Sequence, residues 1–177
     1  KRFFPNALII ADKFHFSRYI YWAFNDVRIR IMNSYPINSE KYRMLKRYWK
    51  ILAKNPLDLS SDSKFNPITK THLSPLGIQD YASNLNPDLE DAMKIKDFFL
   101  SKSKDIRVDK VDSFFDELIL LLENSSNKEF REIKKTFVNW KKEIKLSFSV
   151  RNAEDKRYSN GVIEGINNYI KVIKRIS

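Results

Sequence analysis

Apolar residues recur along most of this chain at the three- and four-residue spacing of amphipathic helices. The pattern predicts one helix over about 15–33 and a second over about 40–54, separated by Ser34-Tyr35-Pro36. At least six helices are expected in all, the later ones beginning near Ser74 and spanning about 87–101, 108–124, 127–148 and 160–176. The stretch 108–148 is best interpreted as an antiparallel helical hairpin.

Two stretches depart from this helical pattern. The run from Asn6 to Asp12 is apolar and β-branched, follows Pro5, and predicts a short buried strand. Residues 55–75 contain three prolines among many small polar residues, which predicts the longest and most flexible loop. The expected fold is therefore mostly α, with one clear strand.

Composition narrows the class of protein. Only 3 glycines in 177 residues argue against a sandwich or barrel, which needs many turns. The absence of cysteine excludes disulfides and thiolate metal sites and suits a cytoplasmic protein. No stretch approaches the roughly 20 apolar residues of a membrane span, so no membrane partner is expected. The chain opens on Lys1 and stops while still helical in pattern, so we expect a fragment of a longer protein.

The net charge of +11 is unevenly distributed. Residues 1–54 hold 12 Lys/Arg against 3 Asp/Glu, residues 55–154 hold 16 against 17, and residues 155–177 hold 5 against 2. The basic ends favour a negatively charged partner, most simply nucleic acid. Solubility alone is the alternative explanation for such charge.

The final helix separates into two faces. Ile163, Ile166, Ile170 and Ile173 form one stripe, which predicts a buried face. The other edge carries one carboxylate, then amides, then positive charge, in the order Glu164, Asn167, Asn168, Lys171, Lys174, Arg175. That order suits a metal-binding acid followed by phosphate-binding groups, and an ordinary solvated surface helix is the alternative.

Asp12 stands at the end of the predicted strand, where acids of α/β folds point into a ligand crevice. Its alternative role is to cap the helix that follows. Two carboxylates far apart in sequence, Asp12 and Glu164, suit phosphoryl transfer assisted by divalent metal ions. Such a site normally needs a third acid. His15 is more typical of a structural residue, and His72 has no partner at metal-ligand spacing.

Two motifs together resemble the catalytic domain of DDE-type transposases of bacterial insertion sequences, specifically the ISL3-like group. The motifs are Phe4-Pro5-Asn6-Ala7 with Ile10-Ala11-Asp12-Lys13-Phe14-His15, and Ser159-Asn160-Gly161 with Glu164-Gly165, Asn167-Asn168 and Ile170 to Arg175. The resemblance covers nearly the whole chain. It departs at Lys13, where the family usually has Arg, and at the end, where an aromatic and glycine segment is missing.

The resemblance implies a ribonuclease-H-like catalytic domain, here truncated, with Asp12 as the second Asp and Glu164 as the Glu of the triad. The first Asp would lie upstream of Lys1, so the fragment should be inactive alone. Its parent would bind Mg²⁺ or Mn²⁺ through the triad and catalyse DNA strand cleavage and transfer, acting in the bacterial cytoplasm at the nucleoid. The partners implied are double-stranded transposon ends and target DNA, with a homo-oligomer as the active complex.

In this interpretation, residues 1–33 and 151–177 belong to the catalytic core and 34–150 form a mainly helical insertion. Asn167, Asn168, Lys171, Lys174 and Arg175 would contact DNA. The basic helix 40–54, with interleaved Tyr42, Tyr48 and Trp49, is a further candidate for DNA contact, unless its rings are core and its cations merely solvated. The alternative functions are a non-catalytic helical DNA-binding or dimerisation module and a decayed transposase remnant.

Overall fold

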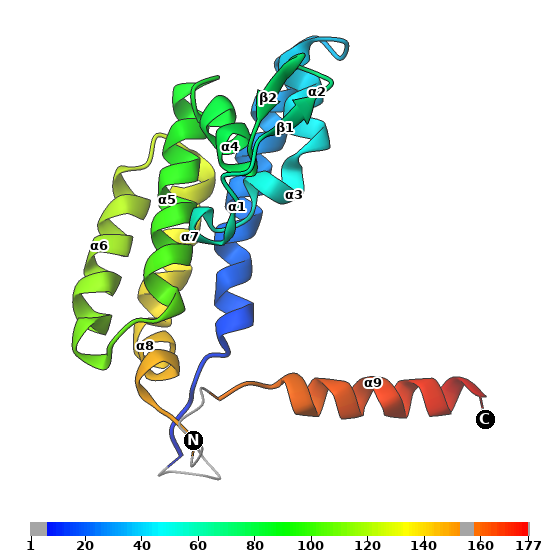
Figure 1. Cartoon of the computed structure of the whole chain (residues 1–177). Helices are drawn as coiled ribbons and strands as arrows, with labels where there is room; N and C mark the ends of the chain where they lie inside the picture. Colours follow the sequence, from blue (N-terminus) through cyan, green and yellow to red (C-terminus); the bar gives the residue numbers. More distant parts are fainter. Residues whose placement is uncertain (1–6, 153–157, 177) are drawn as a thin grey trace.

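The computed structural model describes residues 7–152 and 158–176, and these residues are mostly helical (Figure 1). The elements in chain order are α1 (Lys13–Asn33), α2 (Glu40–Arg47), α3 (Trp49–Leu52), the 3₁₀ turn η1 (Pro56–Asp58), β1 (Lys64–Asn66), β2 (Thr71–Leu73), α4 (Pro75–Ser83), α5 (Pro87–Lys104), η2 (Val108–Lys110), α6 (Val111–Asn124), α7 (Lys128–Asn139), α8 (Lys141–Ser149) and α9 (Gly161–Ile176).

Polar caps set several helix starts where the sequence places them. Ser39 Oγ accepts the N–H of Tyr42 at 3.2 Å and so begins α2. Ser74 Oγ accepts the N–H of Gly77 at 2.9 Å, with proline in the first turn of α4. The starts of α2 and α4 therefore agree with the predicted helix over about 40–54 and the one beginning near Ser74.

The bundle is built around α1, which packs against α5 and α7, while α6 packs against both α5 and α7 (Figure 1). A cluster of phenylalanine rings fills the space between these helices, mostly edge to face. Its members are Phe16, Phe99, Phe114, Phe115, Phe137 and Phe148, all buried. Helices α6 and α7 are joined by a short turn and pack together, which confirms the predicted helical hairpin.

An ion-pair network holds one end of α1 to its neighbours. The Arg30 guanidinium contacts Asp88 of α5 at 3.1 Å and Glu129 of α7 at 3.0 Å. It also donates to Asn127 Oδ1 at 2.6 Å, in the turn between α6 and α7. One arginine therefore joins three helices at the end of the bundle.

Two predicted helices are each broken once. The helix expected over 40–54 is interrupted at Tyr48, and the one expected over 127–148 is interrupted at Trp140. The sequence has neither glycine nor proline at these breaks. Tertiary packing explains the second break, because the change of direction buries Ile144 and Phe148 of α8.

The stretch 55–75, expected to be a loop, contains an antiparallel hairpin of β1 and β2 with Phe65 opposite His72. Asn66 makes the turn, since its Oδ1 accepts the N–H of Ile68 at 2.9 Å and its carbonyl accepts the N–H of Lys70 at 2.9 Å. The short strands carry few apolar residues, so the periodic pattern gave no strand signal there.

The prediction of a buried strand ending at Asp12 is wrong for the residues that the structure describes. Residues 7–12 form no regular element, and Leu8 and Ile9 are exposed. The N–H of Ala11 donates to the carbonyl of Glu143 in α8 at 3.1 Å, and a helix offers no ladder for a strand to join. Asn6, at the start of the predicted strand, lies outside the described residues.

The predicted burial of the isoleucine stripe on α9 is also wrong here. Ile163, Ile166, Ile170 and Ile173 are all exposed, and Figure 1 shows α9 extending away from the bundle. The periodicity correctly gave the helix, but a helix's apolar face is buried only where another element packs on it. The ribonuclease-H-like assignment therefore stays a prediction, while the mostly helical class is confirmed.

Within the described part of the chain, each helix is too short or too polar to pass through a lipid bilayer.

Candidate active site

Asp12 occupies the position immediately before α1 and uses both carboxylate oxygens. Its Oδ1 accepts the backbone N–H of Phe14 at 2.8 Å, which is the helix-capping contact. Its Oδ2 accepts the backbone N–H of Asn160 at 2.7 Å, from the segment that leads into α9. A carboxylate has about four lone-pair positions, so these two bonds orient Asp12 and leave it able to bind a further ligand.

The start of α9 is held by local hydrogen bonds of its own. The carbonyl of Asn160 accepts the N–H of Glu164 at 2.9 Å, closing the first turn. Ser159 Oγ accepts the N–H of Gly161 at 3.1 Å. The bond from Asn160 to Asp12 therefore fixes the beginning of α9 beside the beginning of α1.

Glu164 lies one turn into α9 and faces His15, one turn into α1. Glu164 Oε1 is 3.5 Å from His15 Nε2, and the two side chains are 53% and 52% exposed. Solutes can therefore reach the Glu164–His15 pair, which lies at the same helix junction that Asp12 caps. The N-termini of two helices meet there, and their partial positive charge favours anionic side chains.

The site borders a hollow of about 560 Å³. Asp12 and Asn160 supply its polar wall, and the rest is formed by Leu8, Ile10, Val150, Tyr158, Ser159 and Ile163. The hollow joins the segment before α1 to the segment before α9. A ligand lying there would contact Asp12 directly.

The donor set is suited to a hard cation but is incomplete. Carboxylate oxygens are the ligands that Mg²⁺ prefers, and it is usually bound through one or two of them together with water and substrate phosphates. In the described residues, no three His, Cys, Asp or Glu side chains form a group that could hold a metal ion. Metal binding by Asp12 and Glu164 therefore stays a prediction.

The five predicted DNA-binding residues, Asn167, Asn168, Lys171, Lys174 and Arg175, all lie on α9 beyond Glu164 and are exposed. The three cations occupy the C-terminal half of the helix, which also matches its negative dipole end. Their placement leaves them accessible to a ligand, and their role in DNA binding stays a prediction.

Sequence reasoning missed the contributions of His15 and Asn160. The sequence favours a structural role for His15, yet its ring faces Glu164 from a half-exposed position. The signal was its place three residues after Asp12, since residues at that spacing share one face of a helix. Asn160 acts through its backbone N–H, which no side-chain pattern can reveal.

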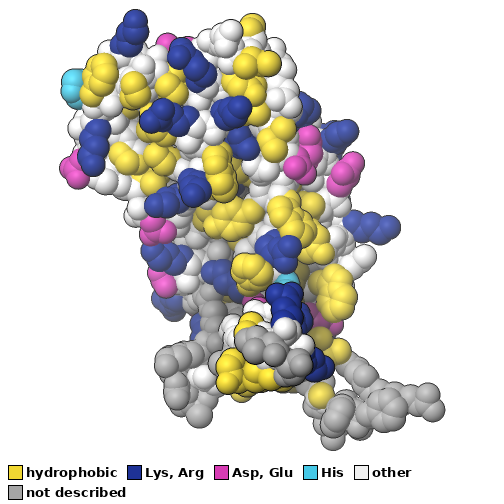
Figure 2. Space-filling view, turned by 90° about the vertical axis from the view of Figure 1, so that its right-hand side faces the viewer, with side chains coloured by type: hydrophobic (Ala, Val, Ile, Leu, Met, Phe, Trp, Pro, Cys, Tyr) yellow, Lys and Arg dark blue, Asp and Glu magenta, His cyan; other side chains and the backbone are white. Residues whose placement is uncertain are grey.

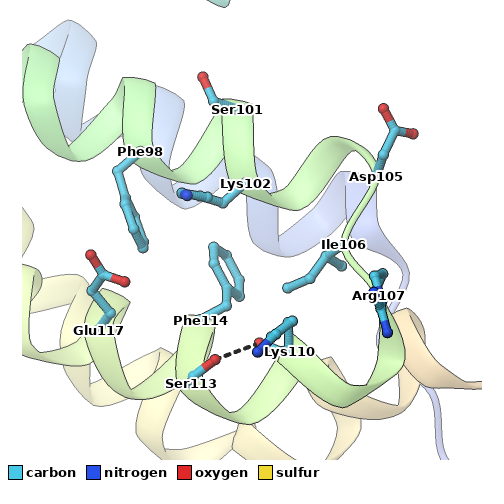
Figure 3. Close-up of a pocket in the computed structure, with 10 residues that line it drawn as sticks. All are labelled: Phe98, Ser101, Lys102, Asp105, Ile106, Arg107, Lys110, Ser113, Phe114 and Glu117. Carbon is cyan, nitrogen blue, oxygen red and sulfur yellow. Dashed lines mark hydrogen bonds between the residues drawn. The ribbon is translucent and has the colours of Figure 1, made fainter.

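A second hollow, of about 450 Å³, lies between α5 and α6 (Figure 3). Its floor is the stacked pair Phe98 and Phe114, with ring centroids 5.6 Å apart. Its rim mixes cations and acids: Lys102, Asp105, Arg107, Lys110 and Glu117. Neither Asp12 nor Glu164 lines it, so it is separate from the candidate active site.

The sequence profile of one protein family, described as a transposase of the DDE type and ISL3 group, matches residues 1–177. No curated protein sequence and no solved structure shows a significant match to the chain.

Proposed function

Since the chain belongs to the ISL3 group of DDE transposases, we propose that it carries two acids of a metal-dependent site for DNA strand cleavage and strand transfer. Those acids are Asp12 and Glu164. The observation that supports the proposal is the junction of α1 and α9, where Asn160 donates to Asp12 at 2.7 Å and Glu164 lies 3.5 Å from His15. The reaction belongs to insertion-sequence transposition.

In this proposal the chain's residues orient the site before any substrate arrives. The N–H groups of Phe14 and Asn160 hold the Asp12 carboxylate, and the His15 ring lies 3.5 Å from Glu164. Mg²⁺ or Mn²⁺ bound there would supply Lewis-acid activation of water or a DNA 3′-hydroxyl and stabilise the leaving oxygen. A third carboxylate would come from the upstream Asp that the family resemblance implies, so the chain alone is expected to be inactive.

Double-stranded DNA is the proposed substrate. Lys171, Lys174 and Arg175 would hold phosphates, while Asn167 and Asn168 would reach the backbone or base edges. From Asn167 to Arg175 the helix rises about 12 Å, enough to follow several phosphates of one strand. Residues 1–33 and 151–177 would then serve catalysis, and 34–150 would be an inserted helical unit that packs on α1. The active complex is proposed to be a homo-oligomer.

Paramagnetic broadening by Mn²⁺ tests the metal site without requiring activity. The chain has 2 histidines, and His15 lies beside Glu164 whereas His72 lies in the β1–β2 hairpin. Low concentrations of Mn²⁺ should broaden the ring signals of His15 and leave those of His72 sharp. Glu164→Gln or Asp12→Asn should each abolish the selective broadening. Equal broadening of both histidines would contradict the metal site.

Strand transfer by the full-length protein tests the catalytic assignment. Metal-dependent joining of DNA ends should be lost in both Glu164→Gln and Asp12→Asn. Activity that is indifferent to Glu164 would refute the site.

A non-catalytic DNA-binding module is the second candidate function. The observation that favours it is the basic helix pair α2 and α3, where six cations accompany one acid over residues 40–54. Tight DNA binding by the full-length protein, without metal-dependent cleavage, would support that alternative.

A further inference from the structure

Three aromatic rings on α1 and α3 are exposed together on one face of the bundle. Tyr21, Trp22 and Trp49 are 37%, 50% and 46% exposed. Two hollows, of about 410 and 580 Å³, share Tyr21, Trp49 and Ala53 in their walls. The hollows therefore adjoin one another at these residues, and each falls in the range of roughly 300–1,000 Å³ typical of ligand pockets.

The first hollow has an aromatic wall and a buried cation. Trp22, Phe24 and Trp49 line it together with Arg28, which is 7% exposed. The Arg28 guanidinium donates to Leu45 O at 2.9 Å and to Asn25 Oδ1 at 2.8 Å, which are neutral acceptors. Burial lowers the pKa of Arg28, but the group stays charged at neutral pH. Positive charge therefore underlies the aromatic wall.

The second hollow is predominantly basic. Four lysines line it, namely Lys13, Lys50, Lys54 and Lys104, against a single acid, Asp58. Asp58 pairs with Lys104 at 2.7 Å. Lys13 directly follows Asp12 in the chain, while Asp12 and Glu164 do not line this hollow. Its basic walls are suited to a chain of phosphates that leads to the aromatic rings.

Cations lie over several of the exposed rings. The Arg18 guanidinium is 4.3 Å from the centre of the Trp22 ring and 5.5 Å from that of Phe14. Lys50 Nζ is 5.7 Å from the centre of Trp49. Figure 2 shows Lys and Arg side chains interleaved with hydrophobic ones across the face formed by α1, α2 and α3, with few acids. Interleaved rings and cations are typical of surfaces that bind single-stranded nucleic acid.

We propose that this face, the Trp22–Trp49 platform, binds unpaired bases of a DNA strand whose phosphates follow the basic hollow. This proposal rests on the proposed function, because strand cleavage and transfer produce unpaired DNA ends. Half-exposed rings can stack on a base that is splayed out, whereas bases within a duplex already stack on each other. The positive charge of both hollows favours a polyanion over an apolar peptide.

Tryptophan fluorescence offers a direct test, since the chain has 3 tryptophans and the third, Trp140, lies outside both hollows. In a Trp140→Phe background, all tryptophan emission comes from Trp22 and Trp49. A single-stranded oligothymidine should quench this emission. An abasic strand of equal length has the same phosphates without bases and should bind more weakly with little quenching.

Substitution of the platform rings should weaken binding to labelled single-stranded DNA. Trp22→Ala and Trp49→Ala are each expected to raise the Kd about 5- to 100-fold. Trp140→Ala is a matched control, because Trp140 is 51% exposed, and it should leave the Kd unchanged. Trp22→Phe keeps a ring and should restore most of the affinity, which separates stacking from misfolding.

The outcomes separate this proposal from the proposed function. The protein could bind duplex DNA and yet bind the oligothymidine and the abasic strand equally well. That result would overturn the platform and leave the proposed transposase function standing. Failure to bind duplex and single strands alike, even at low salt, would overturn both. Equal loss of affinity in Trp22→Ala and Trp140→Ala would also overturn the platform.

Discussion

The backbone N–H of Asn160 donates a 2.7 Å hydrogen bond to Oδ2 of Asp12, joining two positions 148 residues apart. The same carboxylate caps α1 through its other oxygen. Capping and ligand binding were alternative roles for Asp12 in the sequence. The structure shows that Asp12 does cap α1. The capping bond orients the carboxylate and leaves lone pairs that can bind a further ligand.

Substitutions of Asp12 should separate its structural role from its chemical one. Asp12→Ala removes the cap of α1 and should lower the free energy of unfolding by about 1 kcal/mol. Asp12→Asn keeps a side-chain oxygen that can accept the N–H of Phe14, but its NH2 group cannot accept the N–H of Asn160, so it should lose less stability than Asp12→Ala. Urea denaturation of both variants measures the difference. A destabilisation by Asp12→Asn as large as that by Asp12→Ala would contradict this account of the cap.

The sequence predicted the elements of the site better than their surroundings. Asp12 before a helix and Glu164 one turn into another follow from local signals, namely a capping residue and an apolar period. The meeting of α1 and α9 depends on a backbone hydrogen bond from Asn160, which leaves no mark in residue type. The sequence pattern therefore could not predict how α1 and α9 are placed relative to each other.

The failures share a physical cause. The apolar run before Asp12 and the isoleucine stripe of α9 both predict burial, yet Leu8 and Ile166 are exposed. Periodicity reports which face of an element is apolar, and only another element packed there can bury it. The core stripes of α1, α5 and α6 do meet one another, so the same reasoning succeeded for them.

The exposure of α9 predicts that its apolar residues contribute little to stability. Ile166→Ala should change the free energy of unfolding by no more than about 0.5 kcal/mol, because Ile166 is 54% exposed. Leu118→Ala, at a fully buried position of α6, should cost about 2–5 kcal/mol. Chemical denaturation of the two variants compares them directly. A large loss in Ile166→Ala would mean that α9 packs on another surface.

Removal of the three cations at the end of α9 should reduce the salt dependence of duplex DNA binding. The slope of log K against log salt is negative. If Lys171, Lys174 and Arg175 each contact a phosphate, replacing all three by Ala should reduce the magnitude of this slope by about 3. Replacing Lys128, Lys135 and Lys142 on α7 and α8 is a control with the same change in net charge. Equal slopes in the two triple variants would refute a specific role for α9.

The Arg30 network should make part of the free energy of unfolding depend on pH in the acid range. Burial raises the pKa of Glu129, but a backbone hydrogen bond and Arg30 outweigh it and hold the pKa below its ordinary value of 4.5. Because the folded pKa is the lower one, the stabilisation is present above pH 4.5 and is lost as pH falls through the folded pKa.

Glu129→Gln should flatten this acid dependence and cost about 0.5–1 kcal/mol at neutral pH, after allowance for the solvent exposure of Arg30. Thermal unfolding measured between pH 3 and 7 (about the range in which carboxylates titrate) gives the comparison. Glu123→Gln is the control, since Glu123 is exposed and pairs with Lys134 at the surface. An unchanged pH profile in Glu129→Gln would exclude this network as the cause.

Lys96 and Asp97 form an ion pair at 2.5 Å in which the lysine is fully buried. Lys96 Nζ also donates to Lys54 O at 2.9 Å and lies 5.2 Å from the centre of the Phe24 ring. Burial lowers the pKa of Lys96 and raises that of Asp97, although each partner opposes the other's shift. Asp97→Ala should therefore cost about 3 kcal/mol, because it leaves a buried ammonium without its carboxylate.

The double variant Lys96→Met/Asp97→Ala should recover much of this loss, since it removes both charges and keeps an apolar side chain in the space of Lys96. Urea denaturation of the single and double variants gives the coupling energy. Stability of Asp97→Ala should rise with pH between the lowered pKa of Lys96 and its ordinary value, where the unfolded state binds more protons. Additive losses in the double variant would show that the two charges do not act as a pair.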